Sequence, residues 1–116
     1  MLNPFRLLMA KACLDGTQIR DWDSFHDLSA RALGFPWFYG CNVDAWIDCL
    51  TYLDEGDGMS RFKLGPGEVL EIELTGSQIV RRQAPEILDA LVDAVRFVND
   101  RYVQRGKPPK LRLVLG

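Results

Sequence analysis

Three short apolar segments, separated by helical patterns, are the feature that most restricts the fold of this chain. They are Arg6 to Leu14, Glu68 to Thr75, and Leu111 to Leu115. Each has the length and apolar content of a largely buried strand. Strands joined through helices usually lie parallel with right-handed connections. The sequence therefore predicts an α/β protein with a small three-stranded parallel sheet covered by helices.

The interval between the first two strands predicts two helices. The first runs from Ser24 to about Leu33, because apolar side chains recur there at helical spacing, and Asp23 is its expected N-cap. Gly34 is placed to end it. Asn42 is expected to cap a second helix that reaches about Leu53. A loop rich in aromatic residues separates the two helices.

The rest of the chain predicts a long loop and two more helices. The stretch 56–67 contains four glycines and a proline with little periodicity, which is typical of a loop. Residues 77–83 form a short helical segment. Pro85 suits the first turn of a long helix that ends by Gly106. The predicted order is β-α-α-β-α-α-β.

Length and composition are those of one globular domain spanning residues 1–116. The hydrophobic fraction is 47% and the charged fraction 26%, which is enough apolar surface for a core. No apolar stretch approaches the roughly 20 residues that a membrane helix needs. The first residues lack the cationic head and unbroken apolar run of a secretion signal. We therefore expect a cytoplasmic protein with no membrane partner.

Acidic and basic side chains are unevenly distributed. The net charge is −2, but residues 32–60 hold five acids and no base, and residues 96–116 hold six bases and one acid. A net negative chain is not expected to bind nucleic acid directly. The basic segment instead suits the end of a helix, where the dipole stabilises cations. Asp54, Glu55 and Asp57 are typical of a solvated turn. Asp44 and Asp48 need another explanation.

The cysteines and the single histidine indicate no catalytic or metal chemistry. Cys13, Cys41 and Cys49 lack the spacing of a metal site, and the sequence predicts no cofactor. If Cys41 and Cys49 share a helix, they lie roughly 12 Å apart, too far for a disulfide. Reduced thiols fit the cytosol. His26 falls in the first turn of a predicted helix, where a packing or capping role is expected.

Asp44 and Asp48 lie one turn apart on the polar face of the second predicted helix, in line with Thr51 and, if the helix extends that far, Glu55. Asp44 gains about 0.3 to 1 kcal/mol from the helix dipole. Asp48 gains less and has no lysine or arginine three or four residues away. Like charges at this spacing are mildly destabilising. The pair therefore suggests that positive charge comes from outside the helix.

The residues alone leave three interpretations of this pair open. The acids could form a solvated face, or they could present carboxylates to a cationic pocket of a partner. The aromatic loop before the helix favours the second, because Tyr and Trp beside charge are typical interface anchors. A catalytic pair of carboxylates is the third, although the sequence shows no second charged element or metal ligand to form a cleft.

The segment Phe38 to Thr51 resembles the core motif of the barstar family, intracellular inhibitors of the secreted ribonuclease barnase. The matching positions are Tyr39, Gly40, Asn42, Asp44, Ala45, Asp48, Cys49, Leu50 and Thr51. Residues 15–20 and the helix holding His26 also have the family's order and spacing. From about Gly56 onward only the order of strands and helices agrees. There the loop to Gly67 looks like an insertion, and the C-terminal helix and basic tail are longer.

This resemblance implies an α/β inhibitor, without enzyme activity of its own, that blocks the active site of a barnase-type ribonuclease. Its helix acids would stand where RNA phosphates lie among cationic residues, with Asp48 as the main anchor and Asp44 as its companion. The partner-binding residues that it implies are Tyr39, Gly40, Asn42, Asp44, Asp48, Thr51 and Asp93.

Three departures from the motif bear on the partner. Cys41 replaces an acid, Phe38 lacks a tyrosine hydroxyl, and the aromatic and aliphatic residues at Trp46-Ile47 are exchanged. Helical geometry turns Trp46 toward the core. A related nuclease toxin, or a partner that is not a ribonuclease, therefore remains the alternative to a barnase-type target.

Overall fold

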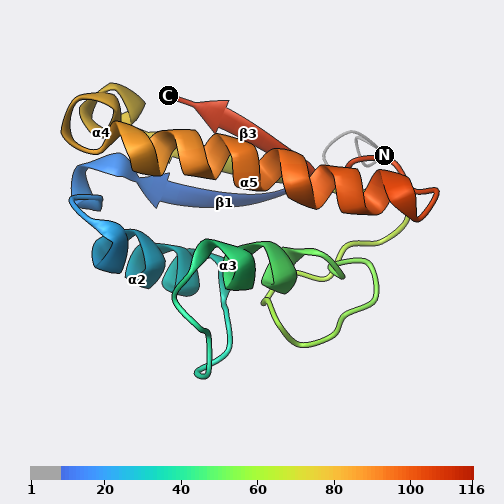
Figure 1. Cartoon of the computed structure of the whole chain (residues 1–116). Coiled ribbons are helices and arrows are strands. Elements are labelled where there is room, and N and C mark those ends of the chain that lie inside the picture. Colours follow the sequence, from blue (N-terminus) through green and yellow to red (C-terminus); the bar gives the residue numbers. More distant parts are fainter. Residues whose placement is uncertain (1–8) are drawn as a thin grey trace, which may run out of the picture.

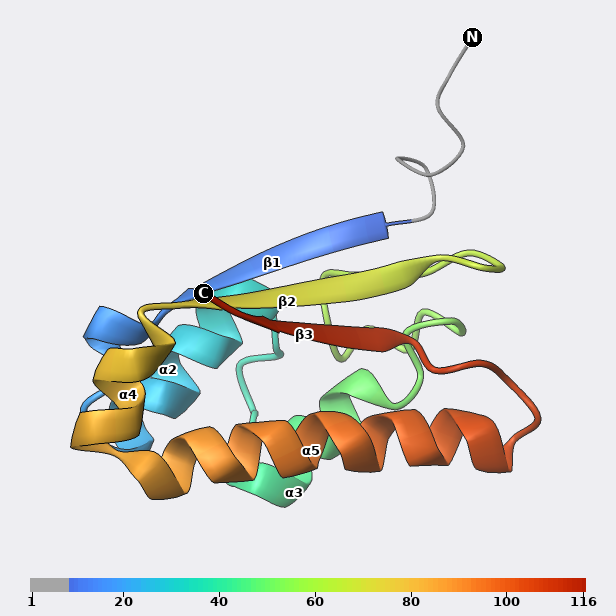
Figure 2. The same ribbon diagram turned by 90° about the horizontal axis from the view of Figure 1, so that it is seen from above.

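The computed structural model describes residues 9–116. Within them a parallel sheet is built from β1 (Met9–Asp15), β2 (Val69–Thr75) and β3 (Leu111–Leu115), with β2 in the middle (Figure 1 and Figure 2). Ala12, Ile72 and Leu113 lie opposite one another in register. The predicted α/β class and three-stranded parallel sheet are confirmed. The start of the first predicted strand, residues 6–8, lies outside the described part of the chain.

Helices fill both crossovers of the described chain. A 3-10 turn η1 (Gly16–Gln18), α2 (Trp22–Leu33) and α3 (Val43–Leu50) connect β1 to β2. The second crossover consists of α4 (Ser77–Gln83) and α5 (Pro85–Gln104). Figure 2 shows that these helices lie on one face of the sheet. The predicted element order is therefore confirmed, but the helices cover only one side.

The open face of the sheet carries charge instead of a second layer of helices. Lys11 pairs with Glu71 at 3.8 Å and with Glu73 at 3.5 Å across β1 and β2, and Arg112 of β3 approaches Glu71 at 3.9 Å. The alternate side chains of β2, Leu70, Ile72 and Leu74, are fully buried. This alternation is typical of a sheet with one covered face.

Helix α2 begins two residues earlier than the sequence predicted. Asp21, not Asp23, is the N-cap: its carboxylate accepts from the Ser24 amide at 2.8 Å, and Ser24 Oγ accepts from the Asp21 amide at 3.1 Å. This reciprocal capping box decides between two nearby carboxylates, because only Asp21 has a serine three residues on. Gly34 ends the helix in the left-handed conformation, as predicted (φ 65°).

Helix α3 begins at the predicted cap and ends early. Asn42 Oδ1 accepts from the Ala45 amide at 2.8 Å, but the helix stops at Leu50 and the chain continues in turns, so the predicted end at Leu53 is wrong. The cause lies on α5. The hydroxyl of Tyr102 donates to the Leu50 carbonyl at 2.8 Å and accepts from the Leu53 amide at 2.9 Å.

The core lies between the sheet and the helices. Trp46 of α3 and Tyr102 of α5 are its largest fully buried side chains, so the inward direction predicted for Trp46 is confirmed. Helix α3 packs against α5, and α5 in turn packs against β3. Among residues 9–116, no helix is long and apolar enough to cross a bilayer.

Candidate acidic binding face

Helix α3 exposes the two acids that the sequence analysis singled out. Asp44 and Asp48 are both exposed, whereas Trp46, Ile47 and Leu50 of the same helix are buried. One turn, about 6 Å along the axis, separates the two carboxylates. Within residues 9–116 Asp44 takes part in no ion pair and no side-chain hydrogen bond. Its negative charge is therefore open to a partner.

Asp48 is held by a cation from the same chain. Arg101 of α5 places Nη1 2.7 Å from Asp48 Oδ1, although the two residues are 53 positions apart. The pair is open to solvent, with side chains 46% and 63% exposed for Arg101 and Asp48. The two acids suggested that positive charge comes from outside the helix, and for Asp48 α5 supplies such a charge. An ion pair this exposed adds only about 0 to 1 kcal/mol of stability.

Thr51 is buried, so its predicted place on the exposed polar line is wrong. It is 3% exposed, and its hydroxyl donates to the Ile47 carbonyl at 2.7 Å. Arg101 donates to Thr51 Oγ1 at 3.1 Å, and Arg105 donates to its backbone carbonyl at 2.9 Å. The helix ends here and two arginines fold over the residue. Thr51 therefore orients Arg101 instead of offering a free hydroxyl.

Tyr39 fixes the loop that leads into α3. Its hydroxyl lies 2.7 Å from His26 Nδ1, and its ring packs against Phe35 with the centroids 4.7 Å apart. Burial raises the pKa of Tyr39 and lowers the pKa of His26. Both groups are thus held neutral at physiological pH. The packing role predicted for His26 is confirmed, and much of the Tyr39 side chain is committed to the fold.

Gly40, Cys41 and Asn42 set the direction of α3. Asn42 Nδ2 donates to the Gly40 carbonyl at 3.3 Å, and a Cβ added at Gly40 would lie only 3.3 Å from that same nitrogen. Cys41 has a left-handed backbone with φ 52°. Such a backbone is costly for a side chain other than glycine or asparagine. The fold therefore specifies this connection tightly, which supports a defined position for Asp44.

Two aromatic side chains stand exposed beside this connection. Trp37 is 95% exposed and Phe38 58% exposed, and their rings meet edge to face with centroids 5.6 Å apart. In Figure 1 the segment between α2 and α3 extends away from the sheet and helices. Exposed aromatic groups of this size are typical of interaction surfaces.

Asp93 is exposed on α5 and pairs with Arg96 at 3.7 Å. Arg96, on the same helix, is its only ion-pair partner among residues 9–116. Its place in the partner-binding set stays a prediction.

The turn after α3 is less solvated than predicted. The side chain of Asp54 is only 12% exposed and pairs with Lys107 and, at 3.5 Å, with Arg105. Burial alone would raise the pKa of Asp54, but the hydrogen bond from Lys107 and the nearby Arg105 lower it. The prediction of a solvated acid is therefore wrong for Asp54. Glu55 and Asp57 are exposed, as predicted.

A shallow hollow of about 220 Å³ lies next to Asp48. Its lining is formed by Thr51, Tyr52, Arg101, Gln104 and Arg105, and contains two guanidinium groups but no carboxylate. The Arg105 guanidinium lies over the rings of Tyr52 and Tyr102, at 4.5 and 4.7 Å from their centroids. The acidic face and a cationic hollow are therefore neighbours.

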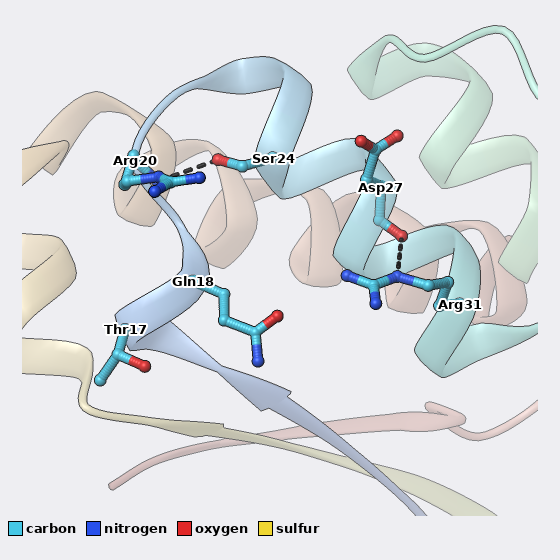
Figure 3. A pocket seen from close by; sticks show the side chains of 6 residues that line it. All are labelled: Thr17, Gln18, Arg20, Ser24, Asp27 and Arg31. Carbon is cyan, nitrogen blue, oxygen red and sulfur yellow. Dashed lines mark hydrogen bonds between the residues drawn. The ribbon is translucent and has the colours of Figure 1, made fainter.

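A second hollow, of about 260 Å³, lies between η1 and α2 (Figure 3). Arg20 and Arg31 line it together with Asp27, and Arg31 Nε donates to the Asp27 carbonyl at 3.4 Å. None of the α3 acids contributes to this lining. The hollow is thus separate from the candidate face.

The cysteines are all reduced. Cys13 and Cys41 are exposed and Cys49 is buried, where burial raises the pKa of its thiol to about 11. A thiol with so high a pKa is a poor nucleophile. In the described chain no three His, Cys, Asp or Glu side chains are grouped to hold a metal ion.

Sequence reasoning missed the arginines of α5. From the local sequence, Arg101 and Arg105 were interpreted as cations near the end of a helix. No pattern in the sequence indicates that they contact residues 48–55. Only the packing of α3 against α5 brings them together.

A comparison with protein-family models matches residues 9–114 to the family described as barstar (barnase inhibitor). The match spans β1, β2, all the helices described above and β3 up to Val114, and it includes the α3 acids. The chain therefore belongs to the barstar family.

Proposed function

We propose that this chain inhibits a barnase-type ribonuclease by covering its active site with the exposed face of α3. The observation that carries the proposal is the pair of exposed carboxylates, Asp44 and Asp48, one turn apart on a helix whose other face is buried. These acids take the place of RNA phosphates among the cationic residues of the enzyme. The chain itself catalyses no reaction in this role.

The surroundings of the acids support a binding face. Tyr39, Gly40 and Asn42 hold the start of α3 in a defined position, and a preformed surface loses less entropy on binding. Trp37 and Phe38 offer large apolar area close to the charges. The combination of aromatic anchors and acids fits a partner with a cationic cleft.

Electrostatic recognition predicts fast, salt-sensitive association. Loss of one partner from a desolvated charge pair costs about 2 to 5 kcal/mol, a range that includes charge pairs of the barnase–barstar complex itself. Asp48→Ala should therefore weaken inhibition by at least about 30-fold, because 1.4 kcal/mol corresponds to a factor of ten.

The test is a titration of barnase with the purified chain in a ribonuclease assay at low and high salt. Wild type, Asp44→Ala and Asp48→Ala are compared with Asp27→Ala, which removes an exposed acid from α2 instead of α3. We expect stoichiometric inhibition by wild type and Asp27→Ala, weaker inhibition by both α3 variants, and weaker inhibition at high salt. A folded Asp48→Ala protein that inhibits as well as wild type would contradict the proposed role of this carboxylate.

A partner that is not a ribonuclease is the second candidate. Arg101 beside Asp48 favours it, because this cation makes the face less suited to a purely cationic cleft. Absence of inhibition by the folded wild-type chain, together with capture of a non-nuclease protein that requires Asp44 and Asp48, would support this alternative.

A further inference from the structure

We infer that the partner of this chain inserts a side-chain carboxylate into the hollow beside Asp48, where Arg101 receives it. The inference rests on the proposed function. It adds one feature of the partner, a carboxylate, which binding to Asp44 and Asp48 does not by itself require. Arg101 thereby acts as a residue that determines specificity, selecting a partner whose cationic cleft carries an acid at its rim.

The contact geometry places Arg101 within the proposed binding face. Its Nη1 atom lies 2.7 Å from Asp48 Oδ1 and 3.1 Å from Thr51 Oγ1, and these two bonds hold the guanidinium at the surface. Thr51 is itself fixed by its bond to the Ile47 carbonyl. A partner that reaches Asp48 therefore also meets the Arg101 side chain, which remains 46% exposed.

Charge complementarity then limits what this partner can be. A partner cation that binds Asp48 comes close to Arg101, and juxtaposed like charges weaken a complex strongly. A neighbouring carboxylate on the partner removes this repulsion, because Arg101 can pair with it while Asp48 pairs with the cation. The result is two crossed ion pairs in place of one.

The hollow supplies the space for such a group. Its lining of Thr51, Tyr52, Arg101, Gln104 and Arg105 offers two guanidiniums, an amide and no acid. Arg105 is already engaged within the chain: its guanidinium donates to the Thr51 carbonyl and pairs with Asp54 at 3.5 Å and Glu55 at 3.8 Å. Arg101 is therefore the cation that the hollow offers to a partner. An exposed guanidinium such as that of Arg101 binds a carboxylate in a fixed planar geometry.

The first experiment measures the affinity of barnase for wild type, Arg101→Gln and Arg82→Gln. Arg82 is an exposed arginine of α4 whose guanidinium, within residues 9–116, bonds only to its own helix. Arg82→Gln therefore removes the same charge as Arg101→Gln at a site away from α3. We expect Arg101→Gln to change the affinity at least tenfold. Binding should weaken if the barnase cleft presents an acid to Arg101 and tighten if it does not. Arg82→Gln should change the affinity less than threefold.

The second experiment tests the carboxylate directly. Single Asp or Glu substitutions are introduced around the rim of the barnase active site, and each variant is measured against wild type and Arg101→Gln. At least one added acid should tighten binding to wild type tenfold or more, and the same acid should give no gain with Arg101→Gln. Circular dichroism confirms that every variant is folded.

Two results overturn the inference while leaving the proposed function intact. In the first, wild type inhibits barnase, and Arg101→Gln and Arg82→Gln change the affinity by the same factor. In the second, the added acids all weaken binding to both forms alike. If neither wild type nor Arg101→Gln binds any member of the set, the proposed function fails and the inference fails with it.

Discussion

Replacement of Tyr102 by Phe tests how α5 holds the end of the acidic helix. The Tyr102 hydroxyl is buried and makes two hydrogen bonds, to the Leu50 carbonyl at 2.8 Å and from the Leu53 amide at 2.9 Å. Burial raises the pKa of Tyr102 to about 12, so the group is neutral over the working range of pH. The phenylalanine ring fills the same space without either bond.

The expected loss follows from the two backbone groups left unpaired. Each buried unpaired group costs about 1 to 3 kcal/mol. Because the hydroxyl's own desolvation cost disappears with it, we expect a loss near 2 to 3 kcal/mol in the free energy of unfolding. For a chain of this size, that corresponds to a decrease in Tm of about 10 °C.

Urea and thermal unfolding, followed by circular dichroism, measure this loss. Tyr52→Phe is the matched control, because Tyr52 is 41% exposed and its hydroxyl makes no hydrogen bond within the described chain. The free energy of unfolding of Tyr52→Phe should stay within about 0.5 kcal/mol of the wild-type value. A Tyr102→Phe protein as stable as the control would show that the hydroxyl does not hold the end of α3.

Three further predictions concern other parts of the fold. Gly16→Ala should destabilise the chain by about 1 to 3 kcal/mol in urea unfolding, because its Cβ would lie 2.4 Å from the Thr75 carbonyl oxygen, which the sheet holds in place. Asn99→Ala should cost about 2 kcal/mol and speed hydrogen exchange at Lys110 and Leu111, since the Asn99 amide bonds both backbone amides and the Leu111 carbonyl. Burial lowers the pKa of His26 in the folded chain, so below about pH 6.5 the unfolded chain binds a proton more readily than the folded chain. The free energy of unfolding should therefore decrease as the pH falls below that value. His26→Gln should flatten this part of the pH dependence in unfolding experiments between pH 7.5 and 5.5, and an unchanged slope would refute the assignment.

Local signals predicted the parts of the fold that depend on neighbouring residues. Gly34 ends α2 through its left-handed backbone, and Asn42 begins α3 through its amide cap. Both effects act within a few residues, so the sequence could predict them. Pro85 marked the first residue of α5 for the same reason. The error at Asp23 was also local, since the serine that completes the capping box with Asp21 was visible in the sequence.

Long-range contacts decided the features that could not be predicted. The end of α3 at Leu50 depends on the hydroxyl of Tyr102, and the burial of Thr51 depends on two arginines more than 49 positions away. The periodicity of one helix contains no information about its neighbours. It therefore predicted that Thr51 is exposed on the polar face, whereas the arginines of α5 cover this residue. The acids of the candidate face could be predicted, but not the cation beside them.

The fold explains the uneven charge of the chain and reduces the number of acids that are available to a partner. The acidic stretch 32–60 and the basic stretch 96–116 meet where the ends of α3 and α5 pack together. Asp48 pairs with Arg101, Asp54 with Lys107 and Arg105, and Glu55 more weakly with the same two cations. Much of the acidic block is therefore compensated within the molecule.

That compensation changes what the acidic block implies about a partner. Residues 32–60 hold five acids and no base, but among residues 9–116 the fold leaves Asp44 without a counterion and gives Asp48 one that is exposed to solvent. A partner attracted by net negative charge alone would gain little at Asp54, where two cations already lie close. Recognition must therefore depend on the local pattern around α3, in which one free acid, one paired acid and one arginine stand side by side.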